Sequence, residues 1–413
     1  MTEKKFQGTN INNVKLHNQQ VVLLSLLYEG SLSRVQLAKK ADLSNTTITN
    51  LVGELIQEGI LSEDAEIELE PKSLRPVGRP RTGVHLVPDS RYAVGVHIGV
   101  GLFRVALTNL YDEIITNQIH EFDINEPAEK VLAQIVESIE VIISESGVGR
   151  DKILGVGVGA SGLVDARSKI NILAPNLNWH NVPLQESIQN AVNLPVVVDN
   201  NVHAMAIGET YFGAARGVDS MAFVYGRTGV GAGLIFRGQV FRGSTTGAGE
   251  IGHMILLMRG GEPCRCGNSG CLETLVSEPI ILRQAENIAR RNPKGLLAKT
   301  INERQDLTLL DRIFTAARNG DKEAHQMIDE RAYYLGLALS NLVNLFNPEL
   351  ILLGGIFAQG KDLFLEPVIR TVRETAFGGL GEKVRVEPTS FGWRAGVLGA
   401  AALALVYFFY QQE

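Results

Sequence analysis

All three cysteines of this 413-residue chain lie within the eight positions from Cys264 to Cys271. They form a C-x-C-x4-C pattern, with Gly267 and Gly270 between the last two cysteines, where glycine permits the tight reversals that bring thiols together. His253 lies eleven residues before the first cysteine, so three thiolates and one imidazole complete the ligand set of a closed, structural zinc site. Three reduced thiols in a loop, or a redox-active triad, are the alternatives, because this spacing is unlike that of common zinc fingers. The predicted metal ligands are His253, Cys264, Cys266 and Cys271.

The composition is that of a soluble globular protein, with 45% hydrophobic and 20% charged residues and a net charge of −6. A chain of this length is expected to form two or three domains. No N-terminal segment combines basic residues with a long apolar run, so we expect no signal peptide. An odd number of cysteines is a poor disulfide framework. The most apolar run, residues 397–410, is shorter than the roughly 20 residues of a spanning helix. We therefore expect a buried core helix there and a cytoplasmic protein without membrane contact.

Residues 18–61 carry three successive helical patterns. Ser33 and Gln36 have the spacing of a capping box at the start of the second helix, and Ser44 is placed to cap the third. The third helix presents short uncharged polar groups early on its outer side, which suit base edges and phosphates in a major groove. This pattern predicts a helix-turn-helix, and the segments "GIL" and "GVHLV" predict the hairpin of a wing. A generic three-helix bundle is the alternative.

Positive charge is local in this region, because the segment "EDAEIELE" is acidic and counterion release is therefore expected to be modest. The segment "KSLRPVGRPR" at residues 72–81 has the composition of a flexible arm that places Arg79 in a minor groove, or of a plain linker. The predicted DNA contacts are Arg34, Ser44, Asn45, Thr46, Thr47, Thr49, Asn50 and Arg79.

Beyond Arg91 the sequence alternates between strands and helices, which indicates an α/β fold. Several predicted strands end in glycines, as in "KILGVGVGA" and "PELILLGGIF". Glycines at strand ends of such folds usually open onto a ligand crevice. Two halves of this kind predict two lobes with a cleft between them.

The segment "GAGEIGHMILLMRGGEPCRCGNSGCLE" resembles the signature of the ROK family, which comprises bacterial repressors and sugar kinases. The stretches "GASGLVD", "APNLNW", "VVVDNNVHAMAIGE" and "GRTGVGAGLIFRGQVFRGSTTGAGEIGH" are similar to family segments in the family order. The resemblance covers nearly the whole chain and implies a zinc ion on the four ligands named above. It also implies an α/β, two-lobed, actin-like fold of the ribonuclease H and sugar kinase type, here behind a winged helix-turn-helix.

The expected division places the winged helix-turn-helix at residues 1–70 and a linker or wing with a Gly-Arg-Pro arm at residues 71–90. Lobe I is expected at residues 91–200 together with a C-terminal helix at about 391–413. Lobe II is expected at residues 201–390, with the zinc loop at 250–273.

The resemblance implies a sugar pocket formed by Asn176, Asn200, Asn201, Glu250, His253 and Glu273. Carboxylates and amides suit such a role because they offer paired hydrogen bonds to neighbouring hydroxyls, and a metal-bound histidine is fixed in tautomer and direction. On this view the cysteines anchor His253 and, through it, one wall of the sugar site. Taken alone, Asn176 or Asn200 would read as a loop asparagine satisfied by its neighbours.

Two departures from the kinase pattern predict a protein that is not an enzyme. The position of the kinase base holds Asn201, whose amide cannot accept a proton at neutral pH. The first phosphate loop is replaced by "HIGVGLFR" at residues 97–104, whereas "GRTGVGAG" survives better.

The resulting prediction is a sugar-responsive repressor of carbohydrate uptake and catabolism genes, located at the bacterial nucleoid. A homodimer or tetramer binds a palindromic operator and is released by a monosaccharide such as xylose or glucose. A neutral sugar is expected because no basic cluster is evident near "DNN" or "GEIGH". The alternatives are a residual sugar kinase and a repressor released by a partner protein.

Overall fold

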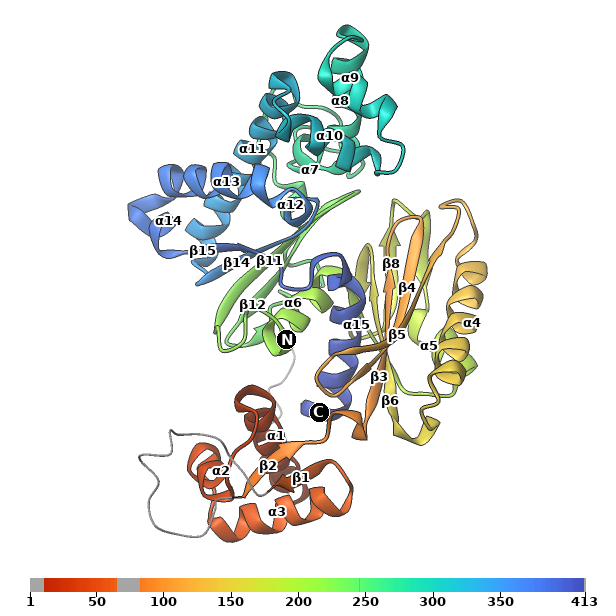
Figure 1. Ribbon diagram of the computed structural model, residues 1–413, viewed down its shortest axis with the longest axis vertical. Coiled ribbons are helices and arrows are strands. Elements are labelled where there is room, and N and C mark those ends of the chain that lie inside the picture. The colour runs from red at the N-terminus through yellow and green to blue at the C-terminus, as the bar shows by residue number, and fades with distance from the viewer. Residues whose placement is uncertain (1–10, 65–81, 245, 412–413) are drawn as a thin grey trace.

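The computed structural model describes residues 11–64, 82–244 and 246–411, and Figure 1 shows a small head below two larger lobes. The head comprises residues 11–64 and 82–86. Its elements are α1 (Ile11–Glu29), α2 (Arg34–Ala41), α3 (Asn45–Gln57), β1 (Leu61–Asp64) and β2 (Gly83–Leu86). The two strands pair antiparallel, with Leu61 opposite Leu86, so the hairpin predicted from "GIL" and "GVHLV" is present. A further bridge between Leu32 and Val84 ties the hairpin to the turn before α2.

The predicted helix starts in the head are confirmed. The Ser33 backbone N–H donates to Gln36 Oε1 at 2.9 Å and the Gln36 N–H donates to Ser33 Oγ at 3.3 Å, which completes the capping box of α2. Ser44 Oγ accepts the N–H of Thr47 at the start of α3. The predicted arm at residues 72–81, including Arg79, lies outside the described residues.

Lobe I contains a five-stranded sheet in the order β10-β6-β3-β4-β5, and lobe II contains a second in the order β13-β12-β11-β14-β15. The strands of lobe I are β3 (Tyr92–Ile98), β4 (Leu102–Asn109), β5 (Ile114–Glu121), β6 (Ile153–Ala160) and β10 (Val196–Asn200). Those of lobe II are β11 (Ser220–Gly226), β12 (Val230–Phe236), β13 (Gln239–Val240), β14 (Leu350–Gly355) and β15 (Arg385–Pro388).

The two sheets have the same topology. When the five strands of each lobe are counted along the chain, both sheets run fifth, fourth, first, second, third. In each sheet the first, fourth and fifth strands are parallel and the second and third form antiparallel pairs. The predicted lobes are therefore built on one repeated plan.

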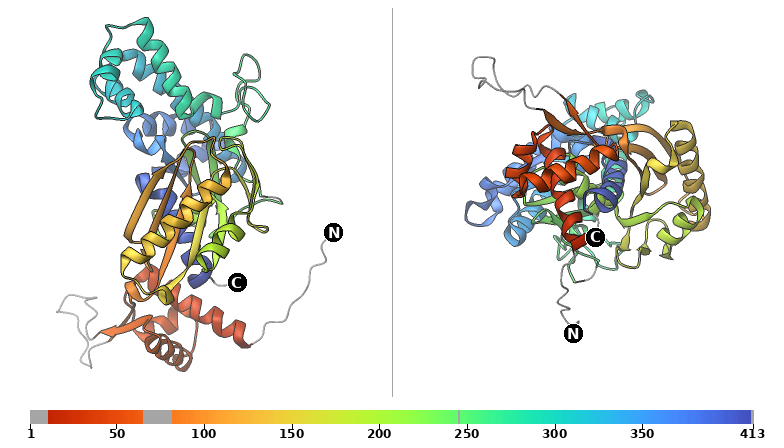
Figure 2. Two further views of the ribbon diagram at one scale, coloured as in Figure 1. Left: turned by 90° about the vertical axis from the view of Figure 1, so that its right-hand side faces the viewer. Right: turned by 90° about the horizontal axis from the view of Figure 1, so that it is seen from below.

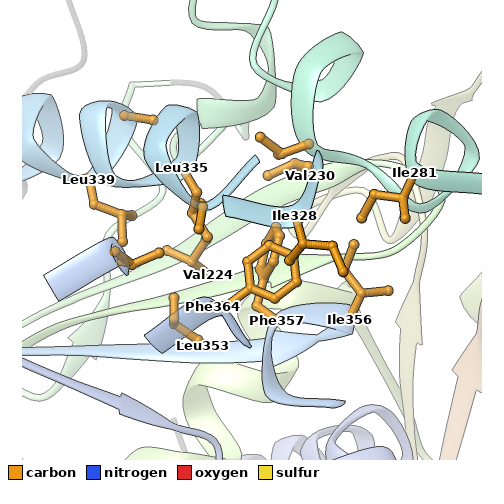
Figure 3. Close-up of a cluster of buried hydrophobic side chains, with 14 of the residues drawn as sticks. Val224, Val230, Ile281, Ile328, Leu335, Leu339, Leu353, Ile356, Phe357 and Phe364 are labelled. Carbon is orange, nitrogen blue, oxygen red and sulfur yellow. The ribbon is translucent and has the colours of Figure 1, made fainter. Parts of the chain in front are cut away.

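The remaining elements cover these sheets. Lobe I adds α4 (Ala128–Ser146), α5 (Leu184–Val192) and a small sheet of β7 (Leu163–Asp165), β8 (Ile170–Ala174) and β9 (Trp179–Val182). Lobe II adds the short turn η4 (Ile251–His253) and the helices α7 (Glu273–Val276), α8 (Glu278–Arg291), α9 (Leu296–Glu303), α10 (Leu309–Arg318), α11 (Lys322–Phe346), α12 (Ile356–Gln359), α13 (Lys361–Thr375) and α14 (Leu380–Lys383). Figure 3 shows Leu335 and Leu339 of α11 facing Val224 of β11 and Phe364 of α13 in the buried core of this lobe.

Two helices, α6 (Asn201–Phe212) and α15 (Ala395–Leu405), lie between the lobes (Figure 1). Glycines let α15 lie directly on the sheet of lobe I. A Cβ on Gly95 would stand 2.5 Å from the Val397 carbonyl oxygen, and one on Gly157 would stand 1.9 Å from that of Ala400. The helical run, residues Gly392–Tyr410, lies within the C-terminal helix expected at about 391–413 and is apolar enough to span a membrane by length and composition. Because 67% of its most apolar window is buried, we interpret it as a core helix.

A continuous apolar core joins the head to the body. It contains Leu23 and Leu27 of α1, Tyr211 of α6, and Phe409 and Tyr410 of the last helical turn. Seen from below, the head helices lie against the end of the body where the chain terminates (Figure 2). The head is therefore packed onto the body and not merely tethered to it.

Candidate functional site

A cavity of about 600 Å³ opens between the lobes at the ends of strands from both sheets. The walls include the turns after β3, β6 and β10 from lobe I and the turn after β11 from lobe II. All six residues predicted for a sugar pocket line it, namely Asn176, Asn200, Asn201, Glu250, His253 and Glu273. The structure thus brings together residues that are up to 97 positions apart in sequence (176 to 273).

The two neighbouring asparagines differ in their free hydrogen-bonding capacity. Asn200 is the N-cap of α6: its Oδ1 accepts the N–H groups of Val202 and His203, and its Nδ2 donates to the Gly162 carbonyl at 2.8 Å. These bonds take up most of the hydrogen-bonding capacity of the Asn200 amide. This agrees with the alternative interpretation of Asn200 as a loop asparagine that is satisfied by its neighbours. Asn201 is buried at the first helical position and its Nδ2 donates to Ser161 Oγ at 3.2 Å.

Directly before them stands the buried carboxylate of Asp199. Its Oδ1 is 3.0 Å from His203 Nδ1, and its Oδ2 pairs with Arg242 from the loop after β13. Burial would raise the pKa of Asp199, but the hydrogen bond and charge of His203, followed by Arg242, outweigh burial and lower that pKa. This ion pair links the end of a lobe I strand to a lobe II loop.

Glycines bring the lobe II wall close to β12. Gly249 has φ +91°, and a Cβ there would stand 1.9 Å from the Ala232 carbonyl oxygen; one on Gly252 would stand 2.1 Å from that of Val230. The pattern "GAGEIGH" thus fits a loop that presses on a strand and presents Glu250 and His253 to the cavity.

Glu273 stands at the start of α7 on the same wall. Its Oε2 accepts the Val230 N–H at 3.2 Å, and burial raises its pKa. A Cβ on Gly229 would lie 2.7 Å from this oxygen, so the carboxylate fits over a glycine turn. The site therefore has two carboxylates: Glu273 is partly buried and Glu250 is exposed. Glu250 precedes His253 in the sequence and Glu273 follows it.

The predicted metal ligands form one compact cluster. The ligand atoms of His253, Cys264, Cys266 and Cys271 all lie within 4.8 Å of one another. Cys264 Sγ is 3.7 Å from His253 Nδ1, and the sulfur atoms of Cys266 and Cys271 are 3.7 Å apart. Metal–sulfur bonds of about 2.3 Å in a tetrahedron place two sulfurs roughly 3.8 Å apart. The four residues can therefore hold one tetrahedral metal ion.

The thiols differ in how readily they ionise without a metal. The backbone N–H of Asn268 and the neighbouring sulfurs lower the pKa of Cys266 to about 7. Burial raises the pKa of Cys271 to about 12, so its thiol stays protonated at neutral pH unless a cation binds.

Several arginines at the cavity escaped the sequence analysis. Arg104, Arg227 and Arg265 line it, and Arg242 pairs with Asp199 beside it. Arg265 lies between two metal ligands and donates to Asn176 Oδ1 of lobe I. The expectation that no basic cluster lies near this site was therefore wrong. These arginines come from separate segments of the sequence. Only Arg104 had a local signal, because it lies opposite His97 on the neighbouring strand.

The polar residues predicted on the third helix are on the outer side of the head. Ser44, Asn45, Thr46, Thr49 and Asn50 are exposed, and Thr47 is half-buried. Thr49 Oγ1 donates to the Asn45 carbonyl. Arg34 is half-buried and pairs with Glu63 at 2.6 Å, which partly neutralises its charge.

The ROK family pattern matches residues 93–406 of the chain, which include both lobes and the four predicted metal ligands. The chain belongs to the ROK family. Its sequence is 32% identical over 393 residues to the xylose repressor of Caldicellulosiruptor bescii, covering 95% of this chain and 96% of that protein. A solved ROK family transcriptional regulator, described as a homologue of the Escherichia coli Mlc protein, has a TM-score of 0.79 and 28% identity, covering 95% and 96% of the two chains.

A ROK family glucokinase from Streptomyces griseus, solved with glucose and AMPPNP, has a TM-score of 0.68 and 30% identity. It covers 76% of this chain and 98% of its own. The body therefore has the two-lobed, actin-like fold that is common to family repressors and kinases. The alignments with the two transcription regulators extend over nearly the whole chain, whereas the kinase alignment leaves about a quarter of it unmatched.

Proposed function

We propose that this protein is a sugar-responsive, DNA-binding transcriptional repressor of carbohydrate uptake or catabolism genes. The observation that carries the proposal is the position of α6. This helix begins with Asn201 in the cavity and ends at Tyr211 and Phe212 in the core shared with the head. Twelve residues of helix span about 18 Å. One rigid element therefore connects a hydroxyl-binding cavity to the proposed DNA-binding head.

The cavity is proposed to bind a monosaccharide. The side chains of Asn201, Glu250 and Glu273 offer the paired acceptors and donors that neighbouring hydroxyls require. We propose that the four-residue cluster holds structural zinc. A zinc ion bound at His253 Nδ1, the nitrogen that faces Cys264 Sγ, would leave the proton on Nε2 and so fix this nitrogen as a hydrogen-bond donor. The metal thus supplies rigidity to this wall and has no part in chemical catalysis.

The head is proposed to be a winged helix-turn-helix, with α3 in the major groove and the β1–β2 hairpin as the wing. The exposed side chains at the start of α3, together with Arg34, are the proposed contacts, and Arg79 is proposed to enter a minor groove. We propose functional units at residues 1–70, 71–90, 91–200 with about 391–413, and 201–390. A homodimer or tetramer would present two such heads to a palindromic operator at the bacterial nucleoid.

Release is proposed to follow from a change in the angle between the lobes. Sugar binding shifts the protein toward the lobe angle that it prefers, by its differential affinity for the two shapes. Because α1 packs on the terminal helical turn and shares an apolar core with the end of α6, that shift moves the head and changes the spacing of two recognition helices. These helices match half-sites about 34–36 Å apart.

Phosphoryl transfer is not part of the proposal. Asn201 carries an amide at the position implied for the kinase base, and it cannot take the proton of an acceptor hydroxyl. His97, at the position implied for an acidic residue of the first phosphate loop, is buried, and its neighbours are arginines.

A thermal-shift panel of monosaccharides, each with and without ATP, tests the proposal. A ligand at 100 times its Kd stabilises the protein by about 2.7 kcal/mol. One sugar that raises Tm without ATP turnover identifies the inducer. ATP consumption with any sugar would establish a kinase instead. If no monosaccharide in the panel raises Tm, release by a partner protein is favoured.

A further inference from the structure

One buried ion pair connects the two lobes beside the cavity. Asp199 stands near the end of β10 in lobe I and is 2% exposed, and its Oδ2 pairs with Arg242, which follows β13 in lobe II. Neither residue is among the described residues that line the cavity. The pair can therefore affect a bound sugar only by placing the residues that touch it.

The two partners of this ion pair differ in how firmly they are held. Asp199 belongs to lobe I, where its Oδ1 accepts the Asn200 N–H at 2.7 Å and lies 3.0 Å from His203 Nδ1. The side chain of Arg242 is 38% exposed, and among the described residues it donates through Nη2 alone. If the lobes separate, Asp199 keeps His203 as its partner and Arg242 turns into water. The pair can thus open without leaving an unpaired charge buried.

A second contact joins the same parts of the molecule. His203 Nε2 lies 3.4 Å from the carbonyl oxygen of Ala248, which belongs to the same lobe II loop as Arg242. Lobe I therefore holds this loop at two points six positions apart. The next residues are Gly249, whose backbone presses on β12, and Glu250, which lines the cavity. The two contacts thus determine how close Glu250 comes to the asparagines of lobe I.

We infer that the ion pair of Asp199 with Arg242 is a latch that holds the lobes at the angle at which the sugar site is complete. Asp199 and Arg242 are then positioning residues, which set sugar affinity from outside the cavity. The inference rests on the proposed function and deepens it. A ligand that needs a conformation populated only in part binds with an affinity reduced by that fraction. Without the latch, sugar binding would also have to close the lobes.

The latch predicts a specific pattern in the response to sugar. Loss of the ion pair lowers the fraction of the closed form, so that more sugar is needed for the same occupancy. The closed form itself is unchanged, so saturating sugar still brings operator affinity to the same low value. A residue that only maintained the fold, or that passed the signal to the head, would reduce the maximal release of operator instead.

The test uses the full-length protein, the sugar identified by thermal shift and operator DNA. In R242Q, the sugar Kd measured by calorimetry is expected to rise by about five- to tenfold, at the lower end of typical couplings because Arg242 is partly exposed. Operator affinity at saturating sugar, measured by fluorescence anisotropy, is expected to match that of the wild type. D199N breaks the same pair from the lobe I side and takes the place of R242Q if that variant does not fold.

Two further variants show whether the charge and the position matter. R242K keeps the charge and is expected to bind sugar within about twofold of the wild type, because a contact made through one nitrogen does not need the guanidinium fork. R318Q is the matched control, because the side chain of Arg318 is 39% exposed and pairs with Asp362 inside lobe II. It is expected to bind sugar and operator as the wild type does.

Weaker sugar binding in R242Q with full release at saturating sugar, restored by R242K, supports the latch. An unchanged sugar Kd in R242Q, a reduced maximal release, or an R242K protein as weak as R242Q overturns it.

Hydrogen–deuterium exchange of the sugar-free protein separates this inference from the proposed function. If the wild type binds no monosaccharide, the proposed function fails and exchange alone decides the latch. Faster amide exchange at residues 246–253 in R242Q than in the wild type and R318Q supports the latch, and equal exchange in all three overturns it.

Discussion

The cavity wall and the head are held in place by different physical means. The wall that carries His253 contains the four residues proposed to hold zinc, and glycines press its loop on β12. The head is fixed by apolar packing of α1 on the terminal helical turn, in a core that also includes Tyr211 of α6. Arg216 reinforces the edge of this contact, because it donates to the Leu27 carbonyl and lies 5.5 Å from the Tyr28 ring.

This difference indicates that the cavity wall is the rigid part and that the head is the part that moves when sugar binds. A coordinated loop holds one geometry, because metal–ligand bonds fix both distance and direction. Apolar packing is non-directional and tolerates small displacements of one helix over another. We therefore expect the cavity wall to present fixed ligands, while α6 shifts with lobe angle and carries the head with it. Four predictions test this contrast.

The largest effect is expected from Cys266→Ser. Removing one ligand abolishes tight metal binding, and a metal at 1,000 times its Kd contributes about 4.1 kcal/mol to the free energy of unfolding. We expect a variant without bound zinc, with a lower Tm and weaker sugar binding, as measured by elemental analysis and calorimetry. Ser269→Ala, in the same exposed loop, is the control. A zinc-free C266S protein that still responds fully to sugar would refute the anchoring role.

Glu273→Gln is expected to weaken sugar binding by about 10- to 150-fold, because a hydrogen bond to a charged group is worth about 1.5–3 kcal/mol. Operator binding without sugar should stay at the wild-type level, because Glu273 is in the cavity wall and not in the head. Calorimetry with the identified sugar measures the first quantity and fluorescence anisotropy with operator DNA the second. Glu286→Gln on the surface of α8 is the control and should change neither sugar affinity nor operator affinity. If E273Q binds sugar as tightly as the wild type does, Glu273 does not contact the sugar.

Asn50→Ala on α3 is expected to lower operator affinity by about tenfold, since one specific contact to a base edge is worth about 1–3 kcal/mol. Sugar affinity should be unchanged. Gln57→Ala, exposed at the far end of the same helix, serves as the control. If both variants bind operator as the wild type does, the early face of α3 does not read DNA.

The smallest effect is expected from Arg216→Gln, which loosens the contact between the body and the end of α1. Neither sugar nor operator affinity should change much alone. Their coupling should fall by about 0.5–2 kcal/mol, so that saturating sugar releases less DNA. Arg373→Gln on the exposed side of α13 is the comparison. Full coupling in R216Q would show that this edge contact does not transmit the signal.

The local features were predictable from sequence because local rules determine them. The Ser33–Gln36 capping box, the Ser44 cap and the grouping of His253 with the three cysteines follow from spacing alone. The six pocket residues were placed together only through the family resemblance. What escaped prediction depends on tertiary contacts: the hydrogen bond from Asn200 Nδ2 to the Gly162 carbonyl, the contact of Arg265 with Asn176, and the convergence of Arg104 with Arg227 on one cavity. Each of these contacts joins two segments that are far apart in the sequence. The periodicity of a sequence does not show how close such segments lie in the folded protein.

The most direct test of the account measures both arms of the coupling on the full-length protein. Operator DNA is first selected from a random pool, and its affinity is determined with and without the sugar identified by thermal shift. Sugar affinity is then determined with and without that DNA. The account predicts that sugar lowers operator affinity by about 5- to 150-fold and that operator lowers sugar affinity by the same factor. Operator affinity that is unchanged by a sugar that demonstrably binds would contradict it.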